Sequence, residues 1–383
     1  MKVVHVLDRL DAVGGVQTYL RRLVPALKER GIESVLLDES SLPGLQQDGP
    51  ALPTATLAAF ERRLDELSPD VCFLHTVLSP SAALAAAEHA PVLAYAHDYA
   101  MVCPGNARFL HRSGRFCEEG PGLRCFRRAY TERSTNRRPD RLLRAYRRTR
   151  AWPEVWPALA GVLVASPFVA DVLAADGIPR ERISVVAYPV EVPPETAPEP
   201  AGDVLYLGRV VASKGVDVLV RALAGTGASL AVAGDGPDRP RLETLTAELG
   251  VDARFLGWVD EERAAALMRG ARVLALPSLW PEAFAMVGVE ALAAGVPVVA
   301  SAVGGIPSWL EDGRGGLLVP AGEVEALRAA LRRVLEEPGF AESLAAAAPE
   351  AARRFSVDAH LDLLVPLLEE AATTGRPAPR ARG

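Results

Sequence analysis

Residues 203–224 read DVLYLGRVVASKGVDVLVRALA and decide the fold of this chain. The apolar run at the start of this stretch predicts a buried strand, Gly208 allows a tight exit from it, and the pattern at 215–224 predicts a helix. Arg209 and Lys214 place two cations beside the start of that helix, where N–H groups attract anions. The stretch therefore predicts a parallel α/β unit with a diphosphate-binding loop, although a surface loop with two solvated cations has the same pattern.

The same alternation of apolar runs and helical patterns extends over most of the chain. We expect strands at 2–7, 71–75, 92–96, 162–165, 183–186, 229–233, 253–256, 272–276 and 297–300, and helices at 15–30, 81–88, 167–175, 238–249, 260–269, 287–294 and 322–336. Such strands are typical of parallel sheets covered on both faces, and the proline-rich stretch 188–202 divides them into two groups. The sequence therefore predicts two doubly wound, Rossmann-like α/β domains. Because ligands bind beyond the carboxyl ends of such strands, we expect the domains to face a central cleft.

Composition excludes several classes of protein. The chain has 383 residues, of which 49% are hydrophobic and 23% are charged, so it is long enough for two domains and too apolar to be disordered. Its net charge of −6 gives no overall reason to expect a nucleic-acid partner. The first residues lack the pattern of an export signal and no apolar run is long enough to span a membrane, so we expect a cytoplasmic protein.

A second segment with chemical character lies at 277–297. Glu282 and Glu290 are eight positions apart, which places Glu282 in a loop after a strand and Glu290 in the first turns of the next helix. Carboxylates suit the vicinal hydroxyls of a sugar or ribose. The N–H groups at the helix start suit phosphate or sugar oxygens, and they belong to Phe284, Ala285, Met286 and Val287. An ordinary surface pair is the alternative, but Glu290 stands among apolar residues, where an idle carboxylate is costly.

Six motifs carry a resemblance to a known family. They are Gly208-Arg209-x4-Lys214-Gly215, Gly234-Asp235-Gly236-Pro237, Phe255-Leu256-Gly257, Pro277-Ser278, Glu282-x7-Glu290-Ala291 and Gly304-Gly305-Ile306. In this order and spacing, residues 202–350 resemble the carboxy-terminal half of glycosyltransferase family 4, whose members are retaining enzymes of the GT-B fold. The resemblance is specific because six separate motifs agree in order.

The resemblance implies a reaction and the roles of residues in it. It implies transfer of a hexose from a nucleotide-diphosphate sugar to an acceptor, a lipid-linked or cell-envelope glycan, with retention of configuration. It implies no metal ion or other cofactor, because Arg209 and Lys214 neutralise the departing diphosphate. It assigns Glu290 to the donor ribose and Glu282, as a catalytic residue, to the transferred sugar.

The resemblance also assigns the domains. Residues 1–190, joined by a C-terminal helix at about 355–372, would bind the acceptor; residues 200–350 would bind the donor; and 373–383 would form a disordered tail. Catalysis would require closure about the linker. Two alternatives stay open: a nucleotide-sugar epimerase or hydrolase on the same fold, and an inactive partner that binds nucleotide sugar.

The first half of the chain carries shorter motifs. Gly14 and Gly15 resemble the family's glycine-rich loop beneath the donor diphosphate, with a plain turn as the alternative. His97 ends a strand where the family has a histidine that faces the reacting sugar, and we expect it to be catalytic. His75 is a weaker candidate of the same kind, and a histidine packed at a strand end is the alternative for both.

Two departures from the family pattern stand out. Ala285 occupies a position where the family often has glycine, so its methyl group puts the identity of the transferred sugar in doubt. Tyr188 and Pro189 stand where relatives often have Asn-Gly, and the sequence assigns them no role.

Three cysteines and a basic segment complete the candidates. Cys103, Cys117 and Cys125 lack a Cys-x2-Cys spacing, so buried or free thiols are favoured over a structural zinc site. Eleven arginines lie between 124 and 150, interleaved with leucine and aromatic residues. We expect a basic, partly apolar helix that contacts anionic membrane headgroups over 124–152. A solvated helix and an anionic acceptor site are the alternatives.

Overall fold

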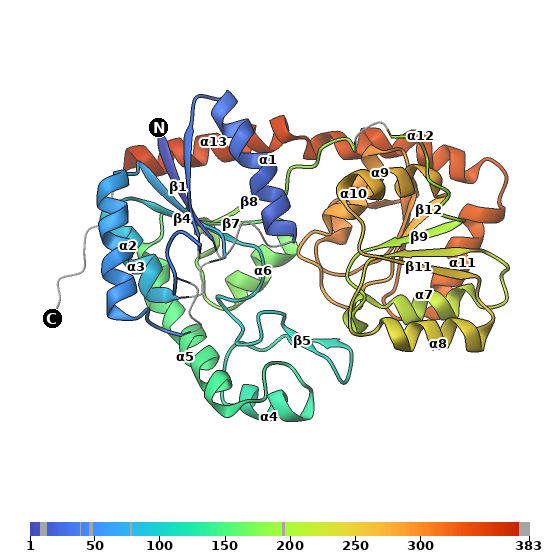
Figure 1. Ribbon diagram of the computed structural model, residues 1–383, viewed down its shortest axis with the longest axis horizontal. Coiled ribbons are helices and arrows are strands. Elements are labelled where there is room, and N and C mark those ends of the chain that lie inside the picture. The colour runs from blue at the N-terminus through green and yellow to red at the C-terminus, as the bar shows by residue number, and fades with distance from the viewer. Residues whose placement is uncertain (8–13, 39, 46–48, 77–78, 194–195, 375–383) are drawn as a thin grey trace. The chain divides into compact units, whose positions relative to one another are not determined.

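The computed structural model describes residues 1–7, 14–38, 40–45, 49–76, 79–193 and 196–374 (Figure 1). Its contacts divide the chain into two compact units. Unit 1 holds Met1–Pro189 with Val357–Gly383, and unit 2 holds Val190–Ser356. Each unit is built on one parallel sheet, which confirms the predicted doubly wound α/β fold.

The sheet of unit 1 has the strand order β2-β1-β3-β4-β7-β8, with parallel pairing throughout. Its strands are β1 (Lys2–Val6), β2 (Glu33–Leu37), β3 (Val71–Leu74), β4 (Val92–Ala96), β7 (Gly161–Val164) and β8 (Ile183–Val185). The inner strands β3 and β4 are buried along their whole length, as their continuous apolar runs predict. From β1 the chain adds β2 on one side and β3 on the other, so the topological switch point lies between β1 and β3.

The helices of unit 1 cover this sheet. They are α1 (Gly15–Glu29), α2 (Thr54–Leu67), α3 (Pro80–His89), α4 (Arg124–Thr131), α5 (Pro139–Val155), α6 (Pro167–Ala175) and α13 (Val357–Thr374). The C-terminal helix α13, red in Figure 1, packs beside the blue helix α1 and against β3 and β4. Thr373 and Thr374, from the expected tail, end this helix; the remainder of that tail, 375–383, lies outside the described residues.

A long connection between β4 and β7 departs from the predicted pattern. It contains a small antiparallel hairpin, β5 (Phe109–Leu110) and β6 (Arg115–Phe116), followed by α4 and α5. The prediction of a single basic helix from 124 to 150 is wrong, because the chain leaves the helical conformation after α4. Arg133 has a left-handed φ of 53°, and Pro139 then starts α5, where a proline is favoured.

The sheet of unit 2 has the order β11-β10-β9-β12-β13-β15-β14. Its strands are β9 (Val204–Leu207), β10 (Leu230–Ala233), β11 (Ala253–Gly257), β12 (Val273–Leu276), β13 (Val298–Ser301), β14 (Glu311–Asp312) and β15 (Gly315–Val319). Its helices are α7 (Val216–Leu223), α8 (Arg239–Leu249), α9 (Glu261–Gly270), α10 (Met286–Ala293), α11 (Val324–Glu336) and α12 (Phe340–Ala352). From β9 the chain moves outward to β10 and β11 and then returns to β12 on the other side. The switch point of unit 2 therefore lies between β9 and β12.

Candidate functional site

Two loops of unit 2 meet at this switch point, where the parallel strands β9 and β12 end. The loop after β9 contains Ser213, whose carbonyl oxygen accepts hydrogen bonds from the N–H groups of Leu279 (2.9 Å) and Trp280 (3.0 Å) in the loop after β12. Gly215 has a left-handed φ of 67°, and a Cβ atom there would lie 2.0 Å from the Pro277 carbonyl oxygen. Glycine is required at this position, so the motif that the sequence analysis singled out is what allows the two loops to touch.

The contact between these loops brings Lys214 to Glu282. The Lys214 Nζ atom donates to Glu282 Oε1 at 2.5 Å, and the Ser278 hydroxyl donates to the same oxygen at 2.5 Å. The Glu282 side chain is 6% exposed and the Lys214 side chain 21% exposed. Lys214 Nζ also lies 5.5 Å from the centre of the Trp280 ring, as in a cation–π contact. A buried, doubly hydrogen-bonded carboxylate and a lysine therefore sit at the edge of the sheet where ligands bind.

The backbone of Glu282 is held from the opposite side by the glycine pair after β13. The Gly305 N–H group donates to the Glu282 carbonyl oxygen at 2.7 Å. A Cβ atom on Gly304, whose φ is 57°, would lie 2.2 Å from that oxygen. Glu282 is therefore fixed through both its side chain and its main chain, which a residue needs if it is to meet a substrate in one orientation.

Tyr206 at the end of β9 belongs to the same cluster. Burial raises the pKa of its phenol, and the nearby Glu282 carboxylate raises it further, so the hydroxyl stays neutral. That hydroxyl donates to the Arg209 carbonyl oxygen at 2.7 Å. The Arg209 side chain is exposed, and no carboxylate of the described residues lies within ion-pair distance of its guanidinium. The loop after β9 therefore exposes the Arg209 guanidinium, while the main chain of Arg209 is held by its hydrogen bond with Tyr206.

Glycines bring a third loop, after β10, against the Arg209 loop. A Cβ atom on Gly234 would lie 1.9 Å from the Gly208 carbonyl oxygen, and one on Gly236 would lie 2.2 Å from the Val210 carbonyl oxygen. The Val210 N–H group donates to Asp235 O at 2.9 Å. These close backbone contacts explain why glycines occur at both 234 and 236.

Helix α10 carries the second glutamate. Glu290 is half-buried in its second turn, and the first N–H groups of the helix have no partners within it. Ala285 caps the helix in the left-handed conformation, with φ 65° and ψ 65°, which glycine adopts without strain. Met286 and Val287 follow as its first two residues, and Phe284 is buried, with its carbonyl oxygen accepting from the Trp309 indole N–H at 2.5 Å.

The predicted site residues are divided between the two units, and those of unit 2 lie close together. Lys214 and Glu282 form one cluster, and Arg209 lies on the same loop as Lys214. Gly15 and His97 belong to unit 1. Gly15 is the first residue of α1, and a Cβ atom added to it would meet no atom of the described residues within 4 Å. Val13, which precedes the two glycines of the expected loop, lies outside the described residues.

His97 lies at the end of β4 in a group of aromatic rings. Its Nε2 atom is 3.1 Å from His75 Nδ1, and its Nδ1 atom is 2.7 Å from the Tyr188 hydroxyl. The Tyr95 ring stacks on it at 4.5 Å between centres. Burial lowers the pKa of His97 to about 3, so the imidazole is neutral at physiological pH.

Two residues of these clusters, Tyr206 and His5, were not predicted from the sequence, and Tyr188 was noted only as a departure from the family pattern without a role. His5 stands within an apolar run of the sequence, and in the structure it is 0% exposed. Because a buried imidazole needs hydrogen-bond partners, a histidine in such a run could have been predicted to belong to a polar cluster. Tyr206 and Tyr188 had no such signal, because their partners lie on other elements of the fold.

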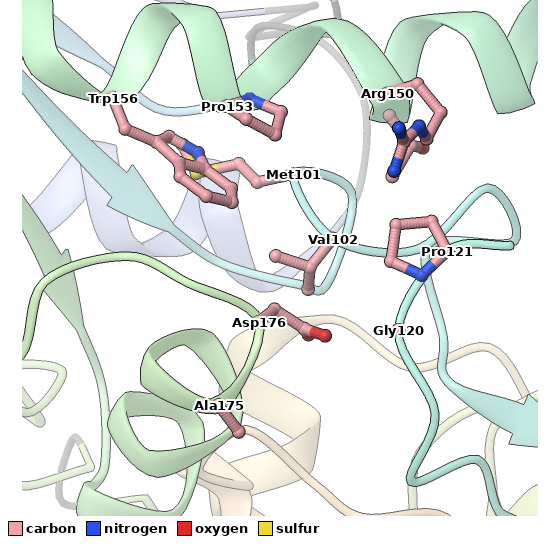
Figure 2. A pocket seen from close by; sticks show the side chains of 10 residues that line it. Met101, Val102, Gly120, Pro121, Arg150, Pro153, Trp156, Ala175 and Asp176 are labelled. Carbon is pink, nitrogen blue, oxygen red and sulfur yellow. The ribbon is translucent and has the colours of Figure 1, made fainter.

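Unit 1 also contains a cavity of about 250 Å³ between the long connection and helices α5 and α6 (Figure 2). Its residues are Met101, Val102, Gly120, Pro121, Thr149, Arg150, Pro153, Trp156, Ala175 and Asp176. Asp176 forms a buried ion pair with Arg108, the side chains being 7% and 3% exposed. Burial raises the pKa of the Asp176 carboxyl, and Arg108 only partly offsets this. The ion pair ties the long connection to the end of α6 beside the cavity.

Among the described residues, no three or more His, Cys, Asp or Glu side chains gather as a metal would require. Cys103, Cys117 and Cys125, all within the described residues, form no disulfide bond, and Cys117 Sγ accepts a hydrogen bond from Arg128 at 3.2 Å. Within the described part of the chain, every helix is too short or too polar to cross a membrane.

Comparison with known proteins identifies the family. The family model described as Glycosyltransferase Family 4 matches residues 13–192, and the model described as Glycosyl transferases group 1 matches residues 191–353. The two matches adjoin and together take in most of both units. The chain therefore belongs to glycosyltransferase family 4, as the motifs predicted.

Curated relatives match part of the chain. It is 40% identical over 181 residues to the D-inositol 3-phosphate glycosyltransferase of Nocardioides sp. (strain ATCC BAA-499 / JS614). That match covers 42% of this chain and 39% of the relative. The chain is 38% identical over 192 residues to the phosphatidyl-myo-inositol mannosyltransferase of Mycobacterium leprae (strain TN), which covers 47% of this chain and 51% of the relative. The matches thus span about half or less of the length of these relatives.

Solved structures match over nearly the whole length. Sucrose-phosphate synthase from Thermosynechococcus elongatus has a TM-score of 0.70 at 22% identity, covering 96% of this chain and 98% of that chain. Anabaena HepE, solved in complex with UDP-glucose, has a TM-score of 0.67 at 18% identity, covering 98% and 99%. At these identities the likeness shows the fold, and the predicted GT-B fold is confirmed.

Proposed function

We propose that this chain transfers a sugar from a nucleotide-diphosphate donor to a hydroxyl acceptor, with retention of configuration and without a metal ion. Unit 2 binds the donor and unit 1 binds the acceptor. The observation that carries this proposal is the Lys214–Glu282 cluster at the switch point of unit 2. A lysine and an exposed arginine on one loop supply positive charge for a departing diphosphate, a role that a metal ion has in other transferases.

Each neighbouring group has a part in donor binding. Arg209 and Lys214 bind the diphosphate, and the N–H groups at the start of α10, from Phe284 to Val287, bind phosphate or sugar oxygens. Glu290 accepts hydrogen bonds from the ribose hydroxyls. Glu282 accepts hydrogen bonds from the transferred sugar, and its two protein contacts on Oε1 leave Oε2 to do so.

In unit 1, Gly15 and His97 are the residues that would contact substrate. Gly15, which has no side chain, starts α1 and suits a phosphate that approaches the backbone closely. His97 contributes an imidazole that hydrogen-bonds a hydroxyl group of the reacting sugar or acceptor.

The acceptors named for the relatives supply the probes for a test of transfer. Purified protein is incubated with UDP-glucose or GDP-mannose, with or without D-inositol 3-phosphate, in the presence of EDTA, and nucleotide diphosphate release and product formation are measured. We expect product from one donor despite the chelator. Glu282→Gln and Glu290→Ala should abolish turnover, whereas Glu342→Ala, at an exposed position on α12, should leave it unchanged.

Three outcomes would contradict this function. Donor consumed equally without an acceptor indicates a hydrolase or epimerase. Donor bound but never consumed indicates an inactive nucleotide-sugar-binding protein. Turnover that persists in both glutamate variants contradicts the site assignment.

We also propose that α4 and α5 contact an anionic lipid surface, which supports peripheral attachment of a cytoplasmic protein. Arg128 and Arg148 point inward, with Arg148 donating to Asn106 Oδ1 at 2.6 Å. The exposed arginines are Arg124, Arg127, Arg133, Arg137, Arg138, Arg141, Arg144, Arg147 and Arg150. Exposed apolar side chains lie among them: Leu123 (79%), Tyr130 (52%) and Leu143 (38%). Cations mixed with exposed apolar groups suit the headgroup region of a membrane.

Vesicle flotation tests this contact. At low salt the protein should float with vesicles that contain phosphatidylserine and stay behind with pure phosphatidylcholine vesicles. The double variant Arg141→Glu, Arg144→Glu should lose flotation, and Arg21→Glu on α1 should keep it. Flotation that is equal for the two vesicle types, or absent with both, contradicts the proposal.

A further inference from the structure

A line of three imidazoles crosses the sheet of unit 1. His5 lies in β1, His75 follows β3 and His97 follows β4, and these strands are neighbours in the sheet. His5 Nδ1 is 3.1 Å from His75 Nε2, and His75 Nδ1 is 3.1 Å from His97 Nε2. At the ends, His5 Nε2 is 3.2 Å from the Ser34 hydroxyl on the edge strand β2, and His97 Nδ1 is 2.7 Å from the Tyr188 hydroxyl. All six ring nitrogens are therefore engaged.

This pattern couples the tautomers of the three rings. A neutral imidazole has one N–H donor and one acceptor nitrogen, and each link in the line joins Nδ1 of one ring to Nε2 of the next. A link fails if both nitrogens carry a proton or if neither does. When all three rings are neutral, they must therefore share one tautomer.

The two end distances indicate which tautomer it is. O–H···O hydrogen bonds measure about 2.5–3.0 Å and N–H···O hydrogen bonds about 2.7–3.2 Å, so a contact at the short end favours a hydroxyl donor and one at the long end favours an N–H donor. The 2.7 Å contact suits the Tyr188 hydroxyl as donor to His97 Nδ1, whereas the 3.2 Å contact suits His5 Nε2–H as donor to Ser34. Both ends lead to the same assignment, with the proton on Nε2 in all three rings.

The surroundings of the line keep it neutral. Burial lowers the pKa of His5 to about 3 and, together with its histidine neighbours, lowers the pKa of His75. Among the described residues, the titratable groups that face the line are Tyr19 of α1, Tyr95 of β4 and Tyr188, with His360 of α13 beyond Tyr19. Asp98 lies close enough to Tyr188 to raise the pKa of its phenol further. Burial raises the pKa of all three tyrosines, so they remain neutral hydrogen-bonding groups.

We propose that His5 and His75 are positioning residues that hold His97 as a neutral imidazole with its Nδ1 lone pair directed at a hydroxyl group. In this structure that hydroxyl belongs to Tyr188, and in the working enzyme a hydroxyl of the bound sugar or acceptor replaces it. The functional part rests on the proposed transferase activity, whereas the tautomer assignment stands on the hydrogen-bond geometry alone. His97 is then an acceptor of hydrogen bonds, and a sugar that lacks the matching hydroxyl binds less well.

Nitrogen NMR of histidine-labelled protein tests the tautomers without any substrate. Long-range ¹⁵N–¹H spectra distinguish the two neutral tautomers and the imidazolium, and single His→Phe variants assign the signals. We expect the Nε2–H form for all three histidines from pH 6 to pH 8. Different tautomers in the three rings, a shared Nδ1–H form, or an imidazolium in that range would overturn the proposal.

Variants at a distance from His97 test the coupling. His75→Phe and Ser34→Ala each remove an acceptor from the line, so the His97 signals should move toward a mixture of tautomers; Ser34→Thr, which keeps the hydroxyl, should leave them in place. Ser34 is only half-buried, so Ser34→Ala gives a folded variant even if His75→Phe does not. Unchanged His97 signals in Ser34→Ala and in folded His75→Phe would contradict the coupling. A protein without transferase activity that shows the expected signals would refute the function and leave the coupling intact.

Discussion

Lys214 is one of three lysines in the chain, with Lys2 and Lys28. In unit 2, arginine supplies every other permanent positive charge. A lysine is a compact point charge, whereas arginine is a wider planar group that binds two oxygens at once. The Lys214 ammonium donates to the Glu282 carboxylate and lies 5.5 Å from the centre of the Trp280 ring, and we expect a wider guanidinium not to keep both contacts.

A substitution series at Lys214 tests this role. Loss of a charge-assisted hydrogen bond costs about 1.5–3 kcal/mol, so Lys214→Ala should weaken binding of nucleotide diphosphate by roughly 10- to 100-fold. Lys214→Arg should weaken it as well, despite its charge. Isothermal titration calorimetry measures both, with Lys28→Ala on the exposed side of α1 as the control. Parent-like affinity in Lys214→Ala would remove Lys214 from the donor site.

Ala285 is a residue in a conformation that suits glycine. Its φ of 65° is left-handed, and this conformation costs an L-residue roughly 1–2 kcal/mol, part of which the greater freedom of glycine in the unfolded chain offsets. Ala285→Gly should therefore stabilise unit 2 by about 0.5–1 kcal/mol in urea denaturation. Ala294→Gly, at the other end of α10 with φ −78°, should destabilise it. Destabilisation by both substitutions would show that Ala285 carries no strain.

At the scale of elements, the Arg108–Asp176 ion pair holds the long connection of unit 1 against α6. Removing one partner leaves a buried charge without compensation, so Arg108→Met should lower the free energy of unfolding by about 3–5 kcal/mol. The double variant Arg108→Met, Asp176→Leu should recover part of that loss. Urea denaturation measures both, and a single variant as stable as the parent would contradict the role of the ion pair.

The elements that could be predicted from sequence are those with strong periodicity. The run 92–96 became β4 with the same bounds, because both of its faces are buried and its pattern is continuous. The hairpin β5–β6 has two residues in each strand and depends on contacts with distant residues, such as the ring contact of Phe116 with Phe168 at 5.6 Å. No local pattern carries that information.

In the candidate site, too, some features could be predicted from the sequence and others could not. Lys214 and Glu282 could be expected at one edge of a sheet, because each follows a strand and parallel strands end together. Ser278 and Lys214 donate to the same oxygen of Glu282. This shared contact depends on how the two loops pack, which the sequence pattern does not contain. The contact of Tyr188 with His97, 91 positions apart, was likewise beyond any sequence pattern.

At the scale of the whole molecule, the distribution of histidines predicts how acid unfolds the chain. All six histidines lie in unit 1 and none in the sequence of unit 2. Burial lowers the pKa of His5 to about 3 and that of His360 to about 4. The unfolded state then binds more protons than the folded state below pH 6.5, so this stability is lost as pH falls from 6.5 toward the folded values.

This linkage amounts to roughly 2 kcal/mol for each of these two histidines at pH 5, which lies about 1.5 units below the ordinary pKa. Unit 1 should therefore unfold at a lower urea concentration at pH 5 than at pH 7, while unit 2 changes little. Hydrogen exchange followed by mass spectrometry assigns the loss of protection to each unit. Equal loss of hydrogen-exchange protection in both units at pH 5 would show that the buried histidines do not cause the destabilisation.

The proposed function requires unit 2 to bind a nucleotide diphosphate through Lys214, Arg209 and Glu290 without a metal ion. Thermal denaturation with UDP, GDP, ADP or TDP, with magnesium or EDTA, tests it most directly on the parent and on Glu290→Ala. A ligand at about 100 times its dissociation constant adds about 2.7 kcal/mol, a shift of several degrees. We expect stabilisation by one nucleotide, equal with magnesium and with EDTA, and lost in Glu290→Ala. Stabilisation only with magnesium, or undiminished in the variant, would contradict it.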